Sequence, residues 1–428
     1  MNFDTAVHEN QDWQSLPTVR SAHTRTMRSL IVTQIIGGVG VGTAASIGAL
    51  LAQSVAHSET YAGLARTAST FGAALVGLPL ALLAARQGRR RALGLGWLLA
   101  AVGGAVLVAA AIEGSVTLLI IGMLLFGSGN ATNLQSRYGA ADLAAPAHRA
   151  RALSVVVWAT TLGAVIGPNL AGPGARVASL FDVPRLAGGF LISAVCLLAA
   201  SIVLWVRLRP DPLLTARHYE PEQHSDPSAR RPSVRLVLGR IMTTPRARLA
   251  FVTVVLGNTV MGAVMTMTPV DMADHGESLT IVGITISVHV LGMYAFSPVV
   301  GWLADRLGRV PVVLSAQLIF LASSLLSGMS HGSVAMVTAG LFLLGLGWSF
   351  AIVGGSALLS ESVDGNIRTV AQGTADTTMN VVAAVAAGVS GPVMATLGFG
   401  GLNALAAALV LPVLVLAAPL ALRAAVAQ

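Results

Sequence analysis

Long apolar runs separated by short polar segments dominate the chain. Each run has roughly 20 residues, the length that a helix needs to cross the hydrocarbon core of a bilayer. The ten-residue alternating segments of a transmembrane barrel are not visible. The pattern therefore predicts an all-α membrane protein with twelve transmembrane helices in two sets of six. The predicted helices lie near 29–53, 62–84, 94–112, 116–136, 152–172, 187–206, 247–270, 279–303, 311–329, 333–356, 369–394 and 398–420.

The polar segments predict how the chain is divided. Residues 208–246 are rich in Pro, Ser and charge, which is typical of a linker, and a short amphipathic helix is expected near 233–242. The first 28 residues are polar and lack the basic-then-apolar start of a signal peptide. We expect a cytoplasmic tail (1–28), an N-terminal six-helix bundle (29–207), a cytoplasmic linker (208–246), a C-terminal six-helix bundle (247–420) and a second cytoplasmic tail (421–428).

The distribution of arginine predicts the orientation. All 26 basic residues are arginine, and only Arg66, Arg176 and Arg185 fall outside the segments of one side. Short cytoplasmic loops of membrane proteins are enriched in Lys and Arg. Both termini and the linker are therefore expected in the cytoplasm, and topology rather than a nucleic-acid partner explains the net charge of +8.

Composition narrows the candidate chemistry. Hydrophobic residues make up 54% of the chain and charged residues only 10%, far below the quarter that is usual in soluble domains. The single cysteine, Cys196, excludes a disulfide framework and a cysteine-based metal site. We find no nucleotide loop and no catalytic constellation, so a membrane enzyme is not expected, nor is a prosthetic group.

Two pairs of soft donors lie on consecutive predicted helices. Met261 and Met265 are four residues apart, as are His289 and Met293, and such positions share a helix face. Thioether sulfur and imidazole nitrogen suit Cu(I) better than a hard cation. His289 is the only histidine of nine well inside an apolar span, where an ionisable residue is a functional candidate. The alternative is packing by the methionines and a structural hydrogen bond by His289.

Other polar residues suggest how transport is driven and how the substrate is captured. Asp376 lies inside the eleventh predicted helix with Asn380 one turn further on, and we expect a proton-coupling or cavity-lining role. A structural hydrogen-bond hub is the alternative. The outer loop after the seventh helix contains acidic residues and no arginine, which favours the capture of cations. These residues are Asp271, Asp274 and Glu277, with His275 among them.

The two halves repeat weakly. Gly301-Trp302-Leu303-Ala304-Asp305-Arg306-Leu307-Gly308-Arg309 follows the eighth helix, and a related basic segment, 86–91, follows the second helix 220 residues earlier. Gly391-Pro392 likewise matches Gly167-Pro168, at an offset of 224. Because both pairs of matching segments are separated by nearly the same number of residues, they predict duplicated, pseudo-symmetric six-helix units.

The 301–309 signature resembles that of the major facilitator superfamily of transporters. The resemblance covers 29–420 and implies a conformational latch formed by Asp305, Arg306, Gly308 and Arg309. The first-half copy departs from it, because Ala81 and Ala85 stand where Gly and Asp are usual. That departure puts an equivalent latch in the first half in doubt.

Within that superfamily, the M-x-x-x-M and H-x-x-x-M motifs resemble the CcoA-like copper importers, bacterial proteins that supply copper for a cbb3-type cytochrome oxidase. The segment from Arg137 to Asp142 strengthens the similarity. The resemblance implies copper as the transported substrate, binding at Met261, Met265, His289 and Met293 in a monomer of the bacterial inner membrane. Related scaffolds take up riboflavin, and the glycine-rich segment 163–168 resembles proton-coupled drug exporters, so both alternatives stay open.

Overall fold

The computed structural model describes residues 13–56, 60–167, 171–219 and 233–426. All its regular elements within these ranges are helices, as predicted. The first half contains α1 (Pro17–Ala56), α2 (Thr60–Gln87), α3 (Arg89–Glu113), α4 (Val116–Ala141), α5 (Arg149–Ile166), α6 (Ala171–Leu180) and α7 (Ala187–Arg207). Then come α8 (Pro212–Tyr219), α9 (Val234–Thr243), α10 (Pro245–Asp274), α11 (Leu279–Tyr294), α12 (Ser297–Leu307), α13 (Arg309–Gly328), α14 (Val334–Ser362), α15 (Gly365–Ala408) and α16 (Leu411–Val426).

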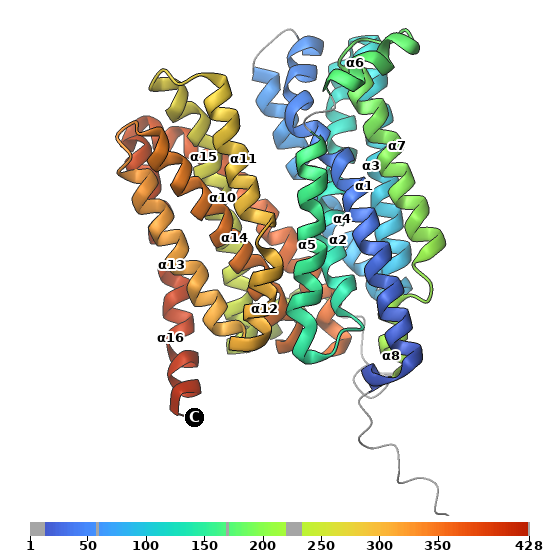
Figure 1. Cartoon of the computed structure of the whole chain (residues 1–428), viewed down its shortest axis with the longest axis vertical. Helices are drawn as coiled ribbons and strands as arrows, with labels where there is room; N and C mark the ends of the chain where they lie inside the picture. Colours follow the sequence, from blue (N-terminus) through green and yellow to red (C-terminus); the bar gives the residue numbers. More distant parts are fainter. Residues whose placement is uncertain (1–12, 57–59, 168–170, 220–232, 427–428) are drawn as a thin grey trace, which may run out of the picture.

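These helices form two bundles that stand side by side (Figure 1). We call α1–α5 and α7 the N-bundle and α10–α16 the C-bundle. Each bundle has its own apolar core: the buried cluster of the N-bundle includes Trp97 and Phe126, and that of the C-bundle includes Phe320 and Trp348. The loops that carry Arg86–Arg91, Arg207–Arg217 and Arg306–Arg309 gather at one end, at the bottom of Figure 1. We call it the arginine-rich end.

Helices long enough to span a membrane occur along the whole of the described chain. Ten of their helical segments are long and apolar enough to cross a membrane. The last, Gly365–Leu420, has 56 residues, more than twice the roughly 20 needed for one crossing, and the backbone kinks at Gly398. The count of twelve crossings and the cytoplasmic placement of the termini stay predictions, because length and composition alone define these ten segments.

Proline explains where the helices differ from their expected bounds. The predicted helix 279–303 is divided between α11 and α12, directly before Pro298, which cannot donate the next helical hydrogen bond. The stretch 398–420 is interrupted at Leu409 and Val410, before Pro412. By contrast, α10 continues through Pro269 as far as Asp274, so part of the expected outer loop is helical.

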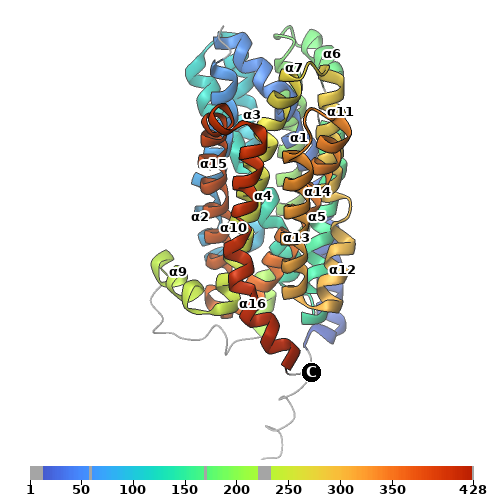
Figure 2. The same cartoon turned by 90° about the vertical axis from the view of Figure 1, so that its left-hand side faces the viewer.

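The segments outside the predicted bundles are also partly helical. The helix α1 begins at Pro17, within the predicted tail. In the linker, α9 lies almost where the amphipathic helix is expected, and the Ser233 hydroxyl accepts the Leu236 N–H at its start. It projects from the side of the molecule near the arginine-rich end (Figure 2). Residues 220–232 of the linker lie outside the described residues.

Candidate functional site

His289 lies in the seam between α11 and α14 and is fully buried. Its Nδ1 is 2.8 Å from the Leu341 carbonyl oxygen. Because a carbonyl only accepts, Nδ1 carries the proton, and in the neutral ring Nε2 then holds a free lone pair. Within the described part of the chain, Nε2 is buried and has no hydrogen-bond partner. The side chain is therefore fixed through one nitrogen and available through the other.

Close packing of α11 and α12 against α14 sets the position of this histidine. Thr285 and Thr338 are joined by a hydroxyl–hydroxyl hydrogen bond of 2.8 Å, and Ser297 and Ser349 by one of 3.0 Å. Between these bonds the backbones approach closely, and a Cβ added at Gly345 would collide with the His289 carbonyl oxygen. A row of small and polar residues thus places His289 against the α14 main chain.

The three predicted methionine donors all contact the apolar core of the C-bundle. Met293 is buried one turn after His289 and belongs to the apolar cluster of the C-bundle, and Met261 and Met265 are partly buried against that cluster. However, α10 and α11 hardly touch each other, because each packs chiefly on other helices, and α14 is a partner of both. The structure thus brings all four predicted donors to the C-bundle but presents the two pairs from separate helices.

Protein carboxylates and thiols do not add to such a site. No group of three or more His, Cys, Asp or Glu side chains able to hold a metal is present among the described residues. A soft metal would therefore depend on the methionine sulfurs and on His289. Cys196 lies on α7 in the other bundle.

The two bundles are joined by a buried ion pair that sequence analysis missed. The Arg137 guanidinium of α4 lies 2.6 Å from the Asp376 carboxylate of α15, with both side chains almost fully buried. Arg137 also donates to the hydroxyls of Tyr138 and Ser356. The second oxygen of Asp376 is buried without a partner in the part of the chain that the structure describes. Asn380 donates to the Asp376 backbone carbonyl and not to this carboxylate.

The sequence pattern places Arg137 in a cytoplasmic segment, because the predicted fourth helix ends at residue 136. In the structure α4 continues to Ala141, and this extra turn buries the guanidinium. One signal was present in the sequence: Gly139, Ala140 and Ala141 follow without a charge until Asp142, which is typical of a close helix contact.

A second cross-bundle contact involves Arg89, at the start of α3. Its guanidinium pairs with Asp142 at 2.8 Å and donates to the Gln372 side chain of α15 at 2.7 Å. In the N-terminal half, the residue that corresponds to Asp305 is Ala85, 220 residues earlier. Alanine has no carboxylate that could bind the first turn of α15, as Asp305 binds the first turn of α5. Arg89 and Gln372 connect the bundles here instead.

The predicted latch residues lie at the same end. The Asp305 carboxylate accepts the backbone N–H groups of Ala150 (3.1 Å) and Arg151 (2.9 Å), in the first turn of α5, where a negative charge is favoured. Arg309 pairs with Glu361 at 2.8 Å and donates to the Pro146 carbonyl oxygen of the N-bundle.

The other two latch residues have local contacts. Gly308 has a φ of 93°, which allows the sharp turn between α12 and α13. The guanidinium of Arg306 lies over the Trp302 ring at 5.2 Å. Asp305 and Arg309 are thus the members of the predicted set that bridge the bundles.

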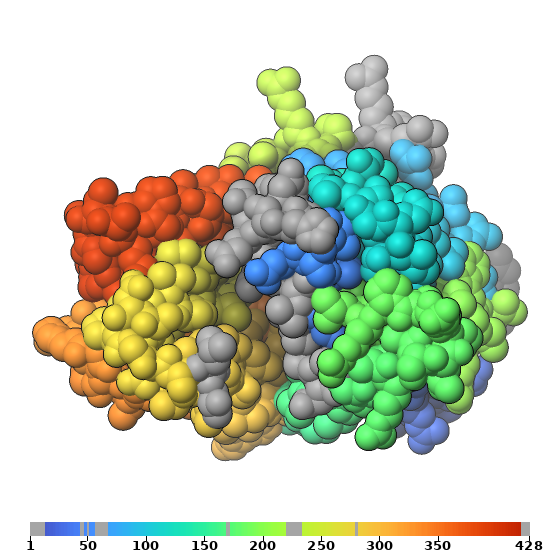
Figure 3. All heavy atoms as spheres, turned by 90° about the horizontal axis from the view of Figure 1, so that it is seen from above, coloured from blue at the N-terminus to red at the C-terminus, as the bar shows by residue number. Residues whose placement is uncertain are grey.

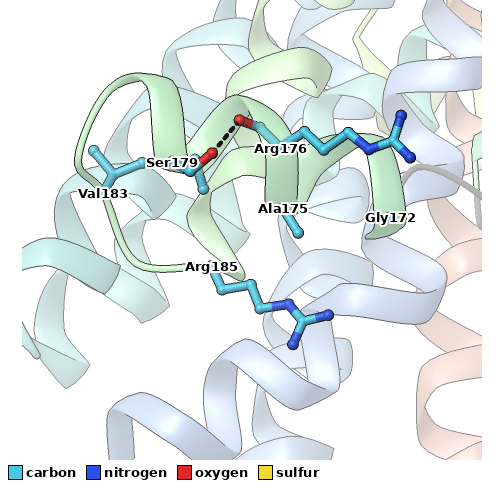
Figure 4. A pocket seen from close by; sticks show the side chains of 7 residues that line it. Gly172, Ala175, Arg176, Ser179, Val183 and Arg185 are labelled. Carbon is cyan, nitrogen blue, oxygen red and sulfur yellow. Dashed lines mark hydrogen bonds between the residues drawn. The ribbon is translucent and has the colours of Figure 1, made fainter.

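The opposite end of the molecule carries both signs of charge. A cavity of about 520 Å³ lies beside α6, and two of the residues that line it are Arg176 and Arg185 (Figure 4). Seen from above, the surface is hollowed between the yellow C-bundle segments and the green segments around α6 (Figure 3). The end of α10 contributes Asp274 and the neighbouring Glu277. The acidic loop after α10 thus shares this end of the molecule with Arg176 and Arg185, and its role in the capture of cations stays a prediction.

His275 caps the C-terminal end of α10. Its Nδ1–H donates to the Asp271 carbonyl oxygen at 2.8 Å, and this bond, with the nearby Asp271 carboxylate, raises the pKa of His275 above 6.5.

Two bundles of apolar helices joined at one end are an architecture that membrane transporters use. The sequence matches the family model of the Major Facilitator Superfamily over 30–271 and 249–427, and the chain belongs to this superfamily. The transporter YddS of Bacillus subtilis (strain 168), described as an uncharacterized MFS-type transporter, is 36% identical over 377 residues, which cover 87% of this chain and 85% of YddS. The riboflavin transporter RfnT of Brucella anthropi is 30% identical over 409 residues, 95% of this chain and 97% of RfnT.

Solved structures share the fold at low sequence identity. The human organic anion transporter MFSD10 superposes with a TM-score of 0.75 at 16% identity, over 92% of this chain and 99% of that protein. A bacterial homologue of the iron transporter ferroportin, in an outward-facing state, has a TM-score of 0.65 at 16% identity, over 92% of this chain and 98% of that protein. The relatives and structural neighbours are transporters and not enzymes.

Proposed function

We propose that the protein imports copper across the inner membrane of a bacterium by alternating access, and that the copper serves the assembly of cuproenzymes such as a cytochrome oxidase. The metal binds in passage to His289 and to the thioethers of Met261, Met265 and Met293. The observation that carries this proposal is the state of His289: its Nδ1–H is held by Leu341, while its Nε2 is buried and has no partner among the residues that the structure describes.

This arrangement is the one that metal-binding histidines use. A ligating histidine almost always donates its other ring N–H to a carbonyl or carboxylate, which fixes the tautomer and orients the free nitrogen. Thioethers and neutral imidazole favour Cu(I), and neither needs to lose a proton to bind it. A zinc site would instead be expected to recruit cysteine or carboxylate ligands.

The contacts at the arginine-rich end are the ones that have to open during the cycle. If that end faces the cytoplasm, release there requires the bundles to separate where Asp305, Arg309 and the Arg137–Asp376 pair now join them. Asp376 couples this step to protons, because protonation removes the charge that holds Arg137 across the bundle interface. Asn380 steadies the helix turn that carries it.

The decisive variant is His289→Asn. The asparagine Nδ2–H takes the place of Nδ1–H toward Leu341, so the seam keeps its hydrogen bond while the metal-binding nitrogen is lost. We expect the accumulation of radioactive copper to fall at least tenfold in cells that express this variant, at unchanged protein level. Met265→Ala is expected to act in the same direction.

Met267→Ala is the matched control, because Met267 is also partly buried on α10 against the same cluster but is not a predicted donor. It should retain copper uptake. Normal copper accumulation in both His289→Asn and Met265→Ala would contradict the proposal. Loss in His289→Ala with normal uptake in His289→Asn would reduce His289 to a structural role.

A second candidate substrate is an organic solute of the riboflavin kind, or a drug carried outward. The similarity to RfnT favours it, as does an aromatic group in the C-bundle. Trp348 donates to Asn258 at 2.9 Å, and its ring meets that of Tyr294 edge to face. Saturable riboflavin uptake that is lost in Tyr294→Ala but kept in His289→Asn would favour this function over copper import.

A further inference from the structure

A second cavity lies at the arginine-rich end, away from the bundle interface described above. Its volume is about 480 Å³. The turn between α2 and α3 forms one wall, and the corner between α7 and α8 forms the other. The lining residues include Arg86, Arg90, Arg91, Arg209, Asp211 and Leu214.

The charge around this cavity is unbalanced. Four arginines line it with a single carboxylate, that of Asp211. This carboxylate already accepts three backbone N–H groups, from Arg90 (2.8 Å), Leu213 (3.0 Å) and Leu214 (3.2 Å). None of the four arginines takes part in an ion pair within the described ranges of the chain. Like charges around one space repel each other, so a bound anion would relieve that repulsion.

The walls of the cavity are held in place by the protein. Asp211 fixes the corner to the first turn of α3, and a Cβ at Gly88 would collide with this carboxylate. Arg217 of α8 donates to the Ala85 carbonyl oxygen at the end of α2, at 2.6 Å. The Tyr219 ring of α8 stacks on Trp13. The backbone segments that carry the arginines are thus fixed relative to one another, which lowers the entropy cost of binding.

Apolar side chains continue upward from the cavity on the outer face of the N-bundle. Leu214 lines the cavity itself and is exposed, and Val206, 64% exposed, lies one helical turn before the corner with Trp205 beside it. Tryptophan is enriched where membrane proteins meet the headgroup region. An acyl chain on this face would bring its headgroup directly to the arginines.

We propose that this cavity binds the headgroup of an anionic phospholipid of the adjoining leaflet. The arginines receive the phosphate, and the exposed apolar residues of α7 and α8 receive the acyl chains. A general bias of arginine toward the cytoplasmic side explains their presence at this end. It does not explain why four arginines line one cavity with a single carboxylate that already accepts three backbone N–H groups, and basic pockets of this kind recognise anionic headgroups.

The test is native mass spectrometry of the purified full-length protein titrated with phosphatidylglycerol, phosphatidylcholine or inorganic phosphate. We expect wild-type protein to bind phosphatidylglycerol in preference to the other two. The triple variant Arg86→Gln/Arg90→Gln/Arg209→Gln should bind phosphatidylglycerol at least tenfold more weakly. The matched control Arg235→Gln/Arg240→Gln/Arg246→Gln removes the same charge from α9 and the start of α10 and should bind it as wild type does.

Equal phosphatidylglycerol binding by the two triple variants would overturn the proposal, because general attraction by basic residues would then suffice. If inorganic phosphate binds as tightly as the lipid, the proposal that the bound phosphate group belongs to a lipid would be overturned. If the first triple variant is unstable, the single variant Arg86→Gln tests the same point, since this side chain is exposed. We expect it to weaken phosphatidylglycerol binding about threefold, and an unchanged affinity would contradict the site.

Discussion

At the scale of single residues, buried polar groups set the properties of this transporter. Arg137 and Asp376 form a buried ion pair between the two bundles. Removing one member of a buried pair leaves the other charge without compensation, which costs more than the pair itself is worth. The pair is therefore suited to a step in which one partner changes its charge.

Asp376→Asn tests this role. The variant leaves the Arg137 guanidinium buried without a counter-charge, and we expect a loss of about 3 kcal/mol in the free energy of unfolding. We also expect uptake to become independent of an imposed pH gradient. The double variant Arg137→Met/Asp376→Leu should recover most of the stability, because no isolated charge remains, but it should stay insensitive to the gradient. Equal stability of the single and double variants would contradict this account.

His275 predicts a small dependence of stability on pH. Its pKa is raised by the Asp271 carbonyl oxygen and carboxylate, so the protonated ring is favoured in the folded state. The stabilisation is complete below the unfolded pKa of about 6.5 and is lost as the pH rises through the higher folded pKa. We expect the unfolding temperature of His275→Gln to fall below that of wild type at pH 5.5 and to match it at pH 9. The same difference at both pH values would exclude this origin.

At the scale of helices, small residues decide how closely α11 approaches α14 and hence where His289 sits. Gly345 lies directly under the His289 carbonyl oxygen, with no room for a side chain. Gly283, on the exposed side of the same α11, has open space around its Cβ position. One glycine is required by packing and the other is not.

Gly345→Ala is therefore expected to separate the two helices and to destabilise the fold by about 1–3 kcal/mol, the usual cost of overpacking. Gly283→Ala should be neutral or stabilising by about 0.5–1 kcal/mol, because alanine is the better helix former. Thermal unfolding of the purified variants measures both. Equal stability of the two variants would show that the seam is not tightly packed.

At the scale of the whole molecule, the contacts described between the bundles gather at the arginine-rich end. They include the Arg89–Gln372 bond, the Arg137–Asp376 pair and the contacts of Asp305 with α5. The helices α2 and α15 also pack closely here, since a Cβ at Gly77 would lie 3.0 Å from the Thr377 hydroxyl. Alternating access requires this end to open.

A cross-link at this end should stop the cycle. Gly77→Cys/Thr377→Cys, in a chain with Cys196 replaced by alanine, places two thiols within reach of a disulfide. We expect oxidation to abolish uptake and a reductant to restore it. Each single-cysteine variant is the control and should be unaffected by oxidation. Full activity of the oxidised double variant would show that this end does not need to open.

The sequence by itself determined the helical membrane class, because apolar runs of spanning length leave a chain few other ways to satisfy its backbone. It also indicated the amphipathic helix near 233–242 and the superfamily, through the signature that ends in Arg309. Its helix ends were less accurate, because the prolines at 298 and 412 break helices whereas Pro269 does not, and local pattern cannot distinguish these outcomes.

Only the tertiary structure decided which polar groups meet. Arg137 and Asp376 are 239 residues apart, and nothing local indicates that α4 and α15 face each other. Spacing placed His289 and Met293 on one helix face, but the packing of α11 on α14 determined that Leu341 holds Nδ1 and that Nε2 has no partner in the described part of the chain. The same packing separated α10 from α11, because contacts between helices depend on the whole bundle and not on the order of helices along the chain.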